Sequence, residues 1–521
     1  MNAPALRAMA AHEVRLRMRR ASTVFAMLAV IAVTWLAIPD PRGGMTLMHA
    51  GGARLLYDSM TLSIGSAVLL NLLFGLGGFY LVRGRVAEDL RCGIGGVLGA
   101  TPVGDGTLLL GRWLGGMAYL CALAAAFMTT MLVLHGLRGE APIQLSAYLQ
   151  TYVLMLLPAI SLAAGMAVLC ESCGPLVGKA GDVLYFIVWA TQFSSMAPTI
   201  NHPFGGWNPL LLIDFNGAAT VIARLIELFG TPDISIGLSD FNAAVPPAII
   251  GSGFWTADMI ATRCASALLG AVPLLPAMLL FHRFSPDRVK AAHGKKRGSP
   301  LDLINRVLRP LARLALPLLA LAGRLPVPAR GIVADLALTL MSKPSLIAAL
   351  AVASLAGLLA QASALGGVVM MSVVFWGIAV SDVAVRNHAA DLESMSGALA
   401  GGATAHALAQ AASTLLLGCL LTAPALLRWM VEAPLRALAL AGGLFFLSAV
   451  AHLLGRATRS ARTFLALFLV AMYISAQAPN AAILDLVGAH GSATPFSVSV
   501  LSAAGLVAIL LAWLFDRRAR R

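Results

Sequence analysis

The stretch Ser59–Val82, with the sequence SMTLSIGSAVLLNLLFGLGGFYLV, contains no charged residue, and the charged segment Arg83-Gly-Arg-Val-Ala-Glu-Asp-Leu-Arg91 follows it directly. A helix needs about 20 apolar residues to cross the hydrocarbon core of a bilayer. The stretch therefore predicts a membrane-spanning helix that ends where Arg83 returns the chain to water.

The whole chain of 521 residues has a composition close to that of this stretch. Hydrophobic residues make up 59% of it and charged residues 12%, and the mean hydropathy is +0.84. Soluble proteins carry about 25% charged residues, so this composition excludes an ordinary water-soluble enzyme. It predicts an all-α polytopic membrane protein.

The hydropathy pattern predicts about twelve membrane-spanning helices, arranged as two six-helix halves. The first half, residues 1–282, has spans near 21–38, 59–82, 108–135, 146–169, 182–198 and 257–282. The second half, residues 331–521, has spans near 344–361, 365–384, 404–427, 435–454, 463–478 and 497–515. An even number of spans places both termini on the same side of the membrane.

The distribution of charge predicts which side that is. The chain carries 37 Lys and Arg against 23 Asp and Glu, a net charge of +14. If both termini are cytoplasmic, 30 of the basic and 13 of the acidic residues fall on the cytoplasmic side. Membrane proteins concentrate Lys and Arg in cytoplasmic loops, so this topology accounts for the charge without a nucleic-acid partner. We expect a multi-pass protein of a bacterial inner (plasma) membrane.

A basic cytoplasmic linker, 283–330, joins the two halves. It contains the polar run His293-Gly-Lys-Lys-Arg-Gly-Ser-Pro300. Apolar residues then recur at helical spacing over 301–314, opposite a basic face with Arg306, Arg309 and Arg313. The pattern predicts a basic amphipathic helix on the inner leaflet. A helix that binds a partner protein is the alternative.

The two halves begin alike, which predicts an internal repeat. A short helix with an acidic residue precedes the first span, at Glu13, and the seventh span, at Asp335. A polar cytoplasmic segment follows the second span of each half, at 83–105 and at 382–402. Internal repeats are common in transporters.

A long outer segment, 199–256, separates the fifth span from the sixth. Its apolar residues from Val221 to Leu228 recur at helical spacing, and Gly230 is placed to cap that helix. We expect the helix to lie in the outer leaflet or across the mouth of a cavity. The corresponding segment of the second half, 479–496, is short.

The sequence lacks the motifs of covalent chemistry, such as a HExxH zinc motif or a GxSxG nucleophile. The run Gly174-Pro-Leu-Val-Gly-Lys179 departs from a phosphate-binding loop, because its glycines are too close together and Ala180 replaces Ser or Thr. Cys170 and Cys173 have CxxC spacing with no second pair nearby. We therefore expect no catalytic residue, no metal site and no cofactor in this chain.

Polar side chains within or at the mouth of a span are candidates for a substrate path, because lipid disfavours them. Six residues qualify: Asp58, Asn71, Tyr80, Gln192, Gln361 and Gln410. Taken alone, each of them is more often a hydrogen bond between helices than a substrate contact, and both interpretations stay open.

The arrangement resembles the permease subunits of ABC exporters of the ABC-2 type. The features in common are the helix before span one, the cytoplasmic segment after span two, the long outer segment and six spans per half. The most specific stretch runs through Glu88-Asp-Leu-Arg91, Gly99-Ala-Thr-Pro-Val103 and Leu109-Leu-Gly-Arg112. It is similar to the family's loop that carries the coupling helix, where the ATPase docks. In the second half Gly401-Gly402 replaces the Thr-Pro-Val element, so weaker docking is expected there.

The resemblance implies an ATP-driven exporter whose ATPase is a separate chain. Two ABC ATPase subunits would bind ATP and Mg²⁺, with room for further membrane or periplasmic export components. The substrate would be amphipathic: a peptide, natural product, drug or lipid-like molecule. The residues expected at the ATPase interface are Glu88, Asp89, Arg91, Thr101, Pro102, Asp105, His388, Asp391 and Glu393.

Two other classes of protein remain as alternatives. A proton-coupled secondary transporter of the major-facilitator type also has six plus six helices, but its Gly-x-x-x-Asp-Arg-x-Gly-Arg signature after span two is absent. A membrane-embedded transferase or a non-transporting scaffold is the third class. The transferase would need a catalytic acid or a metal cluster, which the sequence does not contain.

Overall fold

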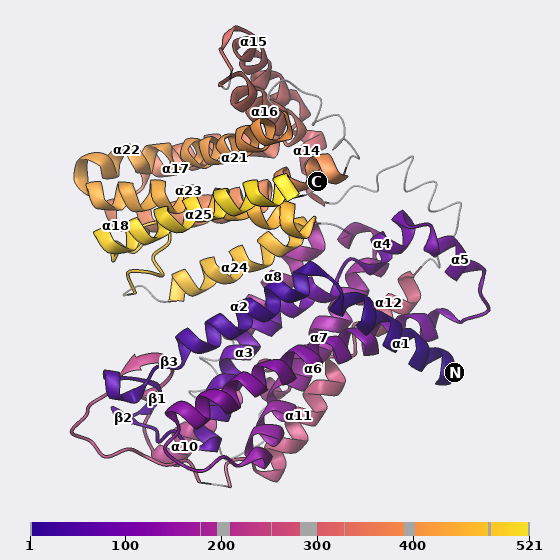
Figure 1. The fold of residues 1–521 in the computed structure, drawn as a ribbon, viewed down its shortest axis with the longest axis vertical. Helices are drawn as coiled ribbons and strands as arrows, with labels where there is room; N and C mark the ends of the chain where they lie inside the picture. The colour runs from indigo at the N-terminus through magenta and orange to yellow at the C-terminus, as the bar shows by residue number, and fades with distance from the viewer. Residues whose placement is uncertain are drawn as a thin grey trace. The chain divides into compact units, whose positions relative to one another are not determined.

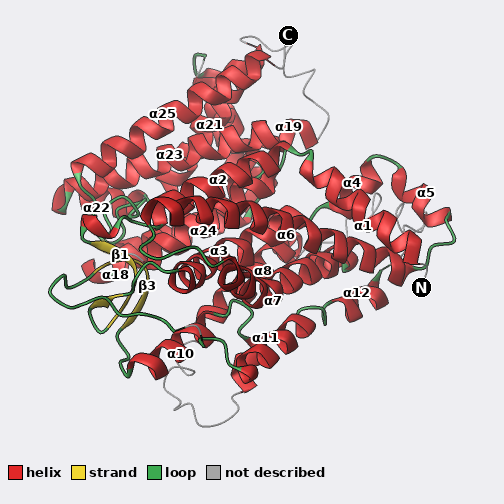
Figure 2. Ribbon diagram, turned by 60° about the horizontal axis from the view of Figure 1, so that its bottom comes forward, coloured by secondary structure: helices red, strands yellow, loops and turns green. Residues whose placement is uncertain are grey.

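The computed structural model describes residues 3–177, 179–194, 209–251, 253–281, 300–327, 329–389, 402–477 and 481–518. These residues are mainly helical, and the one sheet among them has three short strands (Figure 2). The chain forms two compact units, Met1–Ser299 (unit 1) and Pro300–Arg521 (unit 2) (Figure 1).

Unit 1 begins with two helices, a sheet segment and a long apolar helix: α1 (Ala3–Met18), α2 (Ala21–Ala37), the 3-10 turn η1 (Pro41–Gly43), β1 (Met45–Ala50), β2 (Ala53–Arg54) and α3 (Ser59–Val82). It continues with α4 (Arg85–Arg91), α5 (Ile94–Ala100), α6 (Asp105–Arg138), α7 (Leu145–Ser172), η2 (Gly174–Leu176) and α8 (Lys179–Ser194). The last elements are η3 (Pro209–Ile213), α10 (Ala218–Phe229), β3 (Ile234–Asp240), α11 (Ala257–Leu269) and α12 (Leu274–Leu280).

Helices are the regular elements among the described residues of unit 2, and residues 481–494 form an irregular connection before the last helix. Unit 2 begins with α14 (Pro300–Val307), η4 (Arg309–Ala315), α15 (Leu316–Arg324), α16 (Ala329–Ser342), α17 (Ser345–Leu359), α18 (Ala362–Val380), η5 (Val383–Val385) and α19 (Arg386–Ala389). It ends with α21 (Gly402–Leu421), α22 (Ala423–Glu432), α23 (Pro434–Thr458), α24 (Ala461–Gln477) and α25 (Pro495–Arg518).

Eight helices among the described residues are long and apolar enough to cross a membrane, and α16 and α17, bent by 99°, make a ninth if they count as one span. The eight are Ser59–Val82, Asp105–Arg138, Leu145–Ser172, Ala257–Leu280, Ala362–His388, Thr404–Leu421, Pro434–Thr458 and Pro495–Phe515. Each coincides with a predicted span. The chain therefore has the helices of an all-α polytopic membrane protein.

The three other predicted spans, near 21–38, 182–198 and 463–478, correspond to shorter helices. These are α2 with 17 residues, α8 with 16 and α24 with 17. At 1.5 Å per residue a helix of this length is about 24–26 Å long, less than the roughly 30 Å of a hydrocarbon core. The count of twelve spans therefore stays a prediction.

The helices of unit 1 pack around α3, which contacts α6, α7 and α8. Asp58 begins α3 by accepting a hydrogen bond from the Thr61 amide at 2.7 Å, a typical N-cap. One apolar core cluster joins α6, α7 and α12 through Leu108, Leu109, Val168, Leu274, Ala277 and Phe281. The sheet lies at one end of these helices, and α4 and α5 lie at the other end (Figure 1).

The sheet ties the long outer segment to the chain that follows α2. Its strand order is β2-β1-β3, and β1 is antiparallel to both neighbours, with Met45 opposite Asp240 and His49 opposite Arg54. The predicted helix in this segment is α10, and the predicted cap is confirmed, since Gly230 adopts φ 64° at its C-terminus. Val221 and Leu225 of α10 are fully buried, whereas Leu228 is 44% exposed. The location of this helix in a leaflet or across a cavity mouth therefore stays a prediction.

The helices of unit 2 repeat the order and many of the contacts of unit 1. The helix α16 packs against α21 as α1 packs against α6, and α18 contacts α21 and α24 as α3 contacts α6 and α8. Each of α1 and α16 immediately precedes an apolar helix. These contacts agree with the internal repeat that the sequence predicts.

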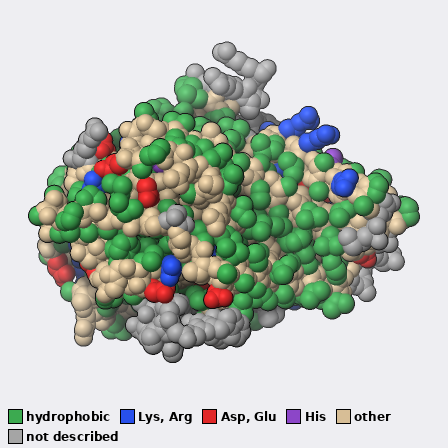
Figure 3. Space-filling view, turned by 90° about the horizontal axis from the view of Figure 1, so that it is seen from below, with side chains coloured by type: hydrophobic (Ala, Val, Ile, Leu, Met, Phe, Trp, Pro, Cys, Tyr) green, Lys and Arg blue, Asp and Glu red, His purple; other side chains and the backbone are tan. Residues whose placement is uncertain are grey.

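Apolar side chains cover much of the molecular face in Figure 3, and charged side chains lie mostly toward its margins. A surface that meets lipid needs this distribution, because charged groups are costly in hydrocarbon.

Candidate functional site

The helices α4 and α5 form a short hairpin between the long helices α3 and α6. The turn between them is at Gly93, whose φ of 73° lies in the left-handed region that glycine adopts without strain. The segment of Thr101, Pro102 and Asp105 then leads from α5 into α6. Six of the nine residues predicted at the ATPase interface therefore lie on this hairpin and its connection.

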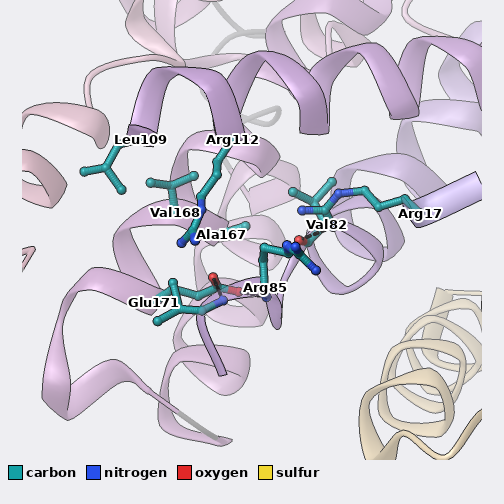
Figure 4. A pocket seen from close by; sticks show the side chains of 9 residues that line it. Arg17, Val82, Arg85, Leu109, Arg112, Ala167, Val168 and Glu171 are labelled. Carbon is teal, nitrogen blue, oxygen red and sulfur yellow. Dashed lines mark hydrogen bonds between the residues drawn. The ribbon is translucent and has the colours of Figure 1, made fainter. Parts of the chain in front are cut away.

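A cluster of charged side chains lies under the base of the hairpin. We call it the basal ion cluster and define it as Glu13, Arg17, Arg85, Asp89, Arg112 and Glu171. Figure 4 shows four of these side chains, those of Arg17, Arg85, Arg112 and Glu171. Its members come from α1, α4, α6 and α7. The carboxylates and guanidinium groups are equal in number, so the cluster is balanced in charge.

Glu13 joins α1 to α4. Its carboxylate accepts hydrogen bonds from Nη2 of Arg17 at 3.1 Å and from Nε of Arg85 at 3.0 Å, and all three side chains are buried. Burial lowers the pKa of the Arg17 guanidinium, and the charge of Glu13 opposes that shift. Arg17 and Arg85 thus share the Glu13 carboxylate, and this contact holds α1 against the α4–α5 hairpin.

Asp89 joins α4 to α6. Arg112 Nη2 donates to Asp89 Oδ2 at 2.5 Å, and Arg85 Nη2 lies 2.9 Å from Oδ1. The Asp89 side chain is only 1% exposed. Burial raises the pKa of this carboxyl above its ordinary value, and Arg112 and Arg85 oppose the rise. Asp89 thus holds the hairpin to its own unit, and its charge does not face outward to a partner as the sequence suggested.

Glu88 is the outward-facing acid of α4. Its side chain is 43% exposed, and it pairs with Arg20 and, at 3.3 Å, with Arg85. It therefore presents a partly accessible carboxylate next to the basal ion cluster. The side chain of Arg91 lies outside the described part of the chain.

The sharp junction between α3 and α4 is stabilised from both sides. Arg17 Nη1 donates to the carbonyls of Leu81 and Val82, at 3.2 and 2.5 Å, where α3 ends. The Glu171 carboxylate accepts from the amides of Gly84, Arg85 and Val86 where α4 begins. Helix ends leave such backbone groups without intrahelical partners, so these two side chains fix the angle between the span and the hairpin.

A small pocket of about 10 Å³ opens among these side chains. Its lining mixes the charged side chains of Arg17, Arg85, Arg112 and Glu171 with apolar residues such as Leu109 and Val168 (Figure 4). This volume is about what one water molecule needs. The basal ion cluster is therefore a closely packed group of ion pairs, and its pocket is too small for a substrate.

Unit 2 has a simpler cluster at the corresponding place. Arg386, at the start of α19, lies 3.5 Å from Asp335 Oδ1 on α16 and donates to Thr339 Oγ1 at 3.0 Å. Ser413 on α21 donates to Asp335 Oδ2 at 2.5 Å. Asp335, Arg386 and Ser413 therefore join α16, α19 and α21 in unit 2. In unit 1, α1, α4 and α6 are joined in a similar way by the contacts of Glu13 with Arg85 and of Asp89 with Arg112. His388 is half-buried on α19, whereas Asp391 and Glu393 lie outside the described residues.

Two of the six candidates for a substrate path hydrogen-bond to neighbouring backbone carbonyls within unit 1. Asn71 Nδ2 donates to the carbonyls of Met155 and Asn216, at 2.9 and 2.8 Å. The Tyr80 hydroxyl donates to the Asp182 carbonyl at 2.9 Å. These contacts favour the helix-packing interpretation for both residues.

The other four candidates lie on four different helices of the two units. Asp58 and Gln361 are N-caps of α3 and α18, and Gln192 is half-buried on α8. Gln410 is buried on α21, and its Oε1 has no hydrogen-bond partner among the described residues. The structure therefore places the residues predicted at the ATPase interface in the first half on one hairpin and its connection, whereas the substrate-path candidates are divided between the two units.

Sequence analysis missed most partners in the basal ion cluster. It also missed Arg263 on α11, a fully buried arginine that donates to the carbonyls of Leu154, Met155, Asp214 and Phe215. Arg112, Glu171 and Arg263 all lie in helices that qualify as spans. A charge inside an apolar stretch marks a residue with a specific partner, and this signal would have singled them out.

Among the described residues, no group of three or more His, Cys, Asp and Glu side chains is placed to hold a metal ion. Comparison of the chain with protein-family models, with curated proteins and with solved structures found no match.

Proposed function

We propose that this chain is the permease subunit of an ATP-driven ABC exporter of the ABC-2 type, in a bacterial inner membrane with both termini cytoplasmic. It would move an amphipathic substrate by alternating access. ATP and Mg²⁺ would bind to two separate ATPase subunits, one for each half of the chain.

One observation carries this proposal: the α4–α5 hairpin rests on a buried ion cluster that reaches three other helices. Glu13, Arg112 and Glu171 link the hairpin to α1, α6 and α7. A force applied to the hairpin would therefore reach several helices together, because buried ion pairs with good geometry resist separation. This is the mechanical property that a docking element for an ATPase requires.

The exposed side of the hairpin has the chemistry of a protein-docking surface. Ile94 is 44% and Val97 68% exposed on α5, and the carboxylate of Glu88 lies at the base of α4. Apolar residues flanked by a charge are typical of the centre and rim of protein interfaces. The weaker pairing at Asp335, 3.5 Å from Arg386, agrees with a second docking element that transmits less force.

The decisive experiment is a purification of the full chain from its native membranes, with mass spectrometry of the proteins that accompany it. We expect a protein with a Walker A loop. The double variant Ile94→Asp/Val97→Asp should lose that protein and the ATP-dependent transport. The matched control is Ile249→Asp, an equally exposed apolar residue of the outer segment, which should keep both.

The same preparation separates the proposal from its alternatives. Transport that continues without ATP and stops when the proton gradient is collapsed would identify a secondary transporter instead. Retention of the ATPase by the hairpin variant would show that docking occurs elsewhere on the chain.

A further inference from the structure

The segment before α16 carries apolar and basic side chains that unit 2 leaves exposed. The structure divides this segment into α14, η4 and α15, which we call the linker helices. They contact α16 and one another, but among their described side chains only Ala315 and Ala322 are buried. Six large apolar side chains stay exposed in or just after them: Ile304, Val307, Leu314, Leu316, Leu321 and Val327.

The charge of this surface has one sign. Arg306, Arg309, Arg313, Arg324 and Arg330 are exposed along the linker helices and just beyond them. Residues 303–334 contain no Asp or Glu. From residue 303 to residue 334 the segment therefore offers guanidinium groups, which bind phosphate oxygens well, and no carboxylate; Asp302, at the start of α14, is the acid that precedes them.

A side-chain hydrogen bond joins the linker helices to the start of α17. Asn305 Oδ1 on α14 accepts a hydrogen bond at 3.0 Å from the amide of Ser345, the first residue of α17. The chain from Ser345 to Leu359 is uncharged. The linker helices therefore lie against the start of an apolar helix and beside α16 (Figure 1).

We propose that the linker helices form a binding surface for anionic phospholipid headgroups of the cytoplasmic leaflet. Arg309 and Arg313 contact lipid phosphates, and Val307 and Leu314 insert into the acyl boundary. The complementary charge, the exposed apolar residues and the position at the start of α17 all fit a lipid surface. This inference does not depend on the proposed coupling to an ATPase.

The test measures the depth of one residue in a bilayer of defined composition. The full chain, freed of its native cysteines, carries Leu314→Cys labelled with a fluorophore and is placed in nanodiscs that contain nitroxide-labelled lipid. We expect stronger quenching when phosphatidylglycerol replaces part of the phosphatidylcholine, and a loss of this difference in high salt. A label at Ala243→Cys in the outer segment should respond to neither change.

Two variants separate charge from structure. Arg309→Gln/Arg313→Gln should need roughly 30-fold more phosphatidylglycerol for half-maximal quenching, which corresponds to about 1 kcal/mol per charge. Arg309→Lys/Arg313→Lys keeps the charge and should behave like the unchanged chain. Arg309 and Arg313 are both exposed, so the two double variants should have the melting temperature of the unchanged chain.

Three outcomes would overturn the proposal. The first is a label at residue 314 that no lipid nitroxide quenches. The second is equal quenching in both lipids together with no effect of the glutamine variant. The third is protection of residue 314 by a protein in native membranes, which would assign the surface to a protein partner.

Discussion

Glu13 and Arg85 lie 72 residues apart in the chain and are joined by a buried hydrogen bond of 3.0 Å from Nε to Oε1. The contact joins α1 to the α4–α5 hairpin. Asp335 and Arg386 make the equivalent contact in unit 2, at 3.5 Å. Both units thus contain an acid–arginine contact whose two members belong to different helices, as expected for the predicted repeat.

Replacing Glu13 by Gln should lower the free energy of unfolding by about 3 kcal/mol, because it leaves two buried arginines beside an uncharged partner. The measurement is the melting temperature of the purified chain in detergent. Glu227→Gln is the control, since Glu227 and its partner Arg224 form an exposed pair that contributes less than about 1 kcal/mol. Equal losses in the two variants would contradict a buried role for Glu13.

The pH dependence of stability should report on Asp89. Its pKa is raised above the ordinary value of 3.8 by burial, so the folded chain takes up this proton before the unfolded chain does. Stability contributed by protonated Asp89 is therefore present at low pH and is lost as the pH rises through the raised pKa. Compared with Asp89→Asn, the unchanged chain should gain melting temperature on acidification toward pH 4. A relative loss would mean that Arg112 and Arg85 outweigh burial.

Gly115 on α6 should tolerate no side chain. A Cβ placed there would lie 2.5 Å from Glu13 Cβ and 3.0 Å from the Ala10 carbonyl, so Gly115→Ala should push α1 away from α6. Overpacking of this kind costs about 1–3 kcal/mol. Gly106→Ala in the same helix meets no atom within 4 Å and should leave the melting temperature unchanged or slightly higher. A stabilising effect of Gly115→Ala would rule out the close contact.

Arg263 should control the order of the outer segment. Pro158 lacks an amide hydrogen, so the carbonyl of Leu154 loses its helical partner, and Arg263 Nε donates to it at 3.1 Å. The same guanidinium donates to the carbonyls of Asp214 and Phe215. Arg263→Met should raise hydrogen exchange across 209–230, and Arg263→Lys should raise it less. Unchanged exchange in both variants would show that other contacts hold the segment.

Cysteine labelling should establish the sidedness that the charge distribution predicts. In a background without native cysteines, Ser235→Cys should react with an impermeant reagent from outside. Val97→Cys, which is exposed on α5, should react only after the membrane is permeabilised. The reverse pattern would overturn the topology and, with it, the proposed docking of an ATPase at the hairpin.

The sequence by itself determined the elements whose signal is local. The long apolar stretches within α3, α6 and α7 predict their helices, because the cost of placing charge in lipid acts on each span separately. Gly230 could be predicted as a cap, because the left-handed conformation needs only the residue itself. The matching acids at Glu13 and Asp335 indicated the repeat in the same way.

Only the tertiary structure decided what the charged residues do. Periodicity places Glu88 and Asp89 on one short helix, but it does not tell which of them meets Arg112 and becomes buried. Glu171 caps α4 from a residue 85 positions away in sequence, and Arg263 reaches a turn 49 positions away. Such partners depend on which helices pack together, and hydropathy carries no information on that packing, because lipid and helix interiors are equally apolar.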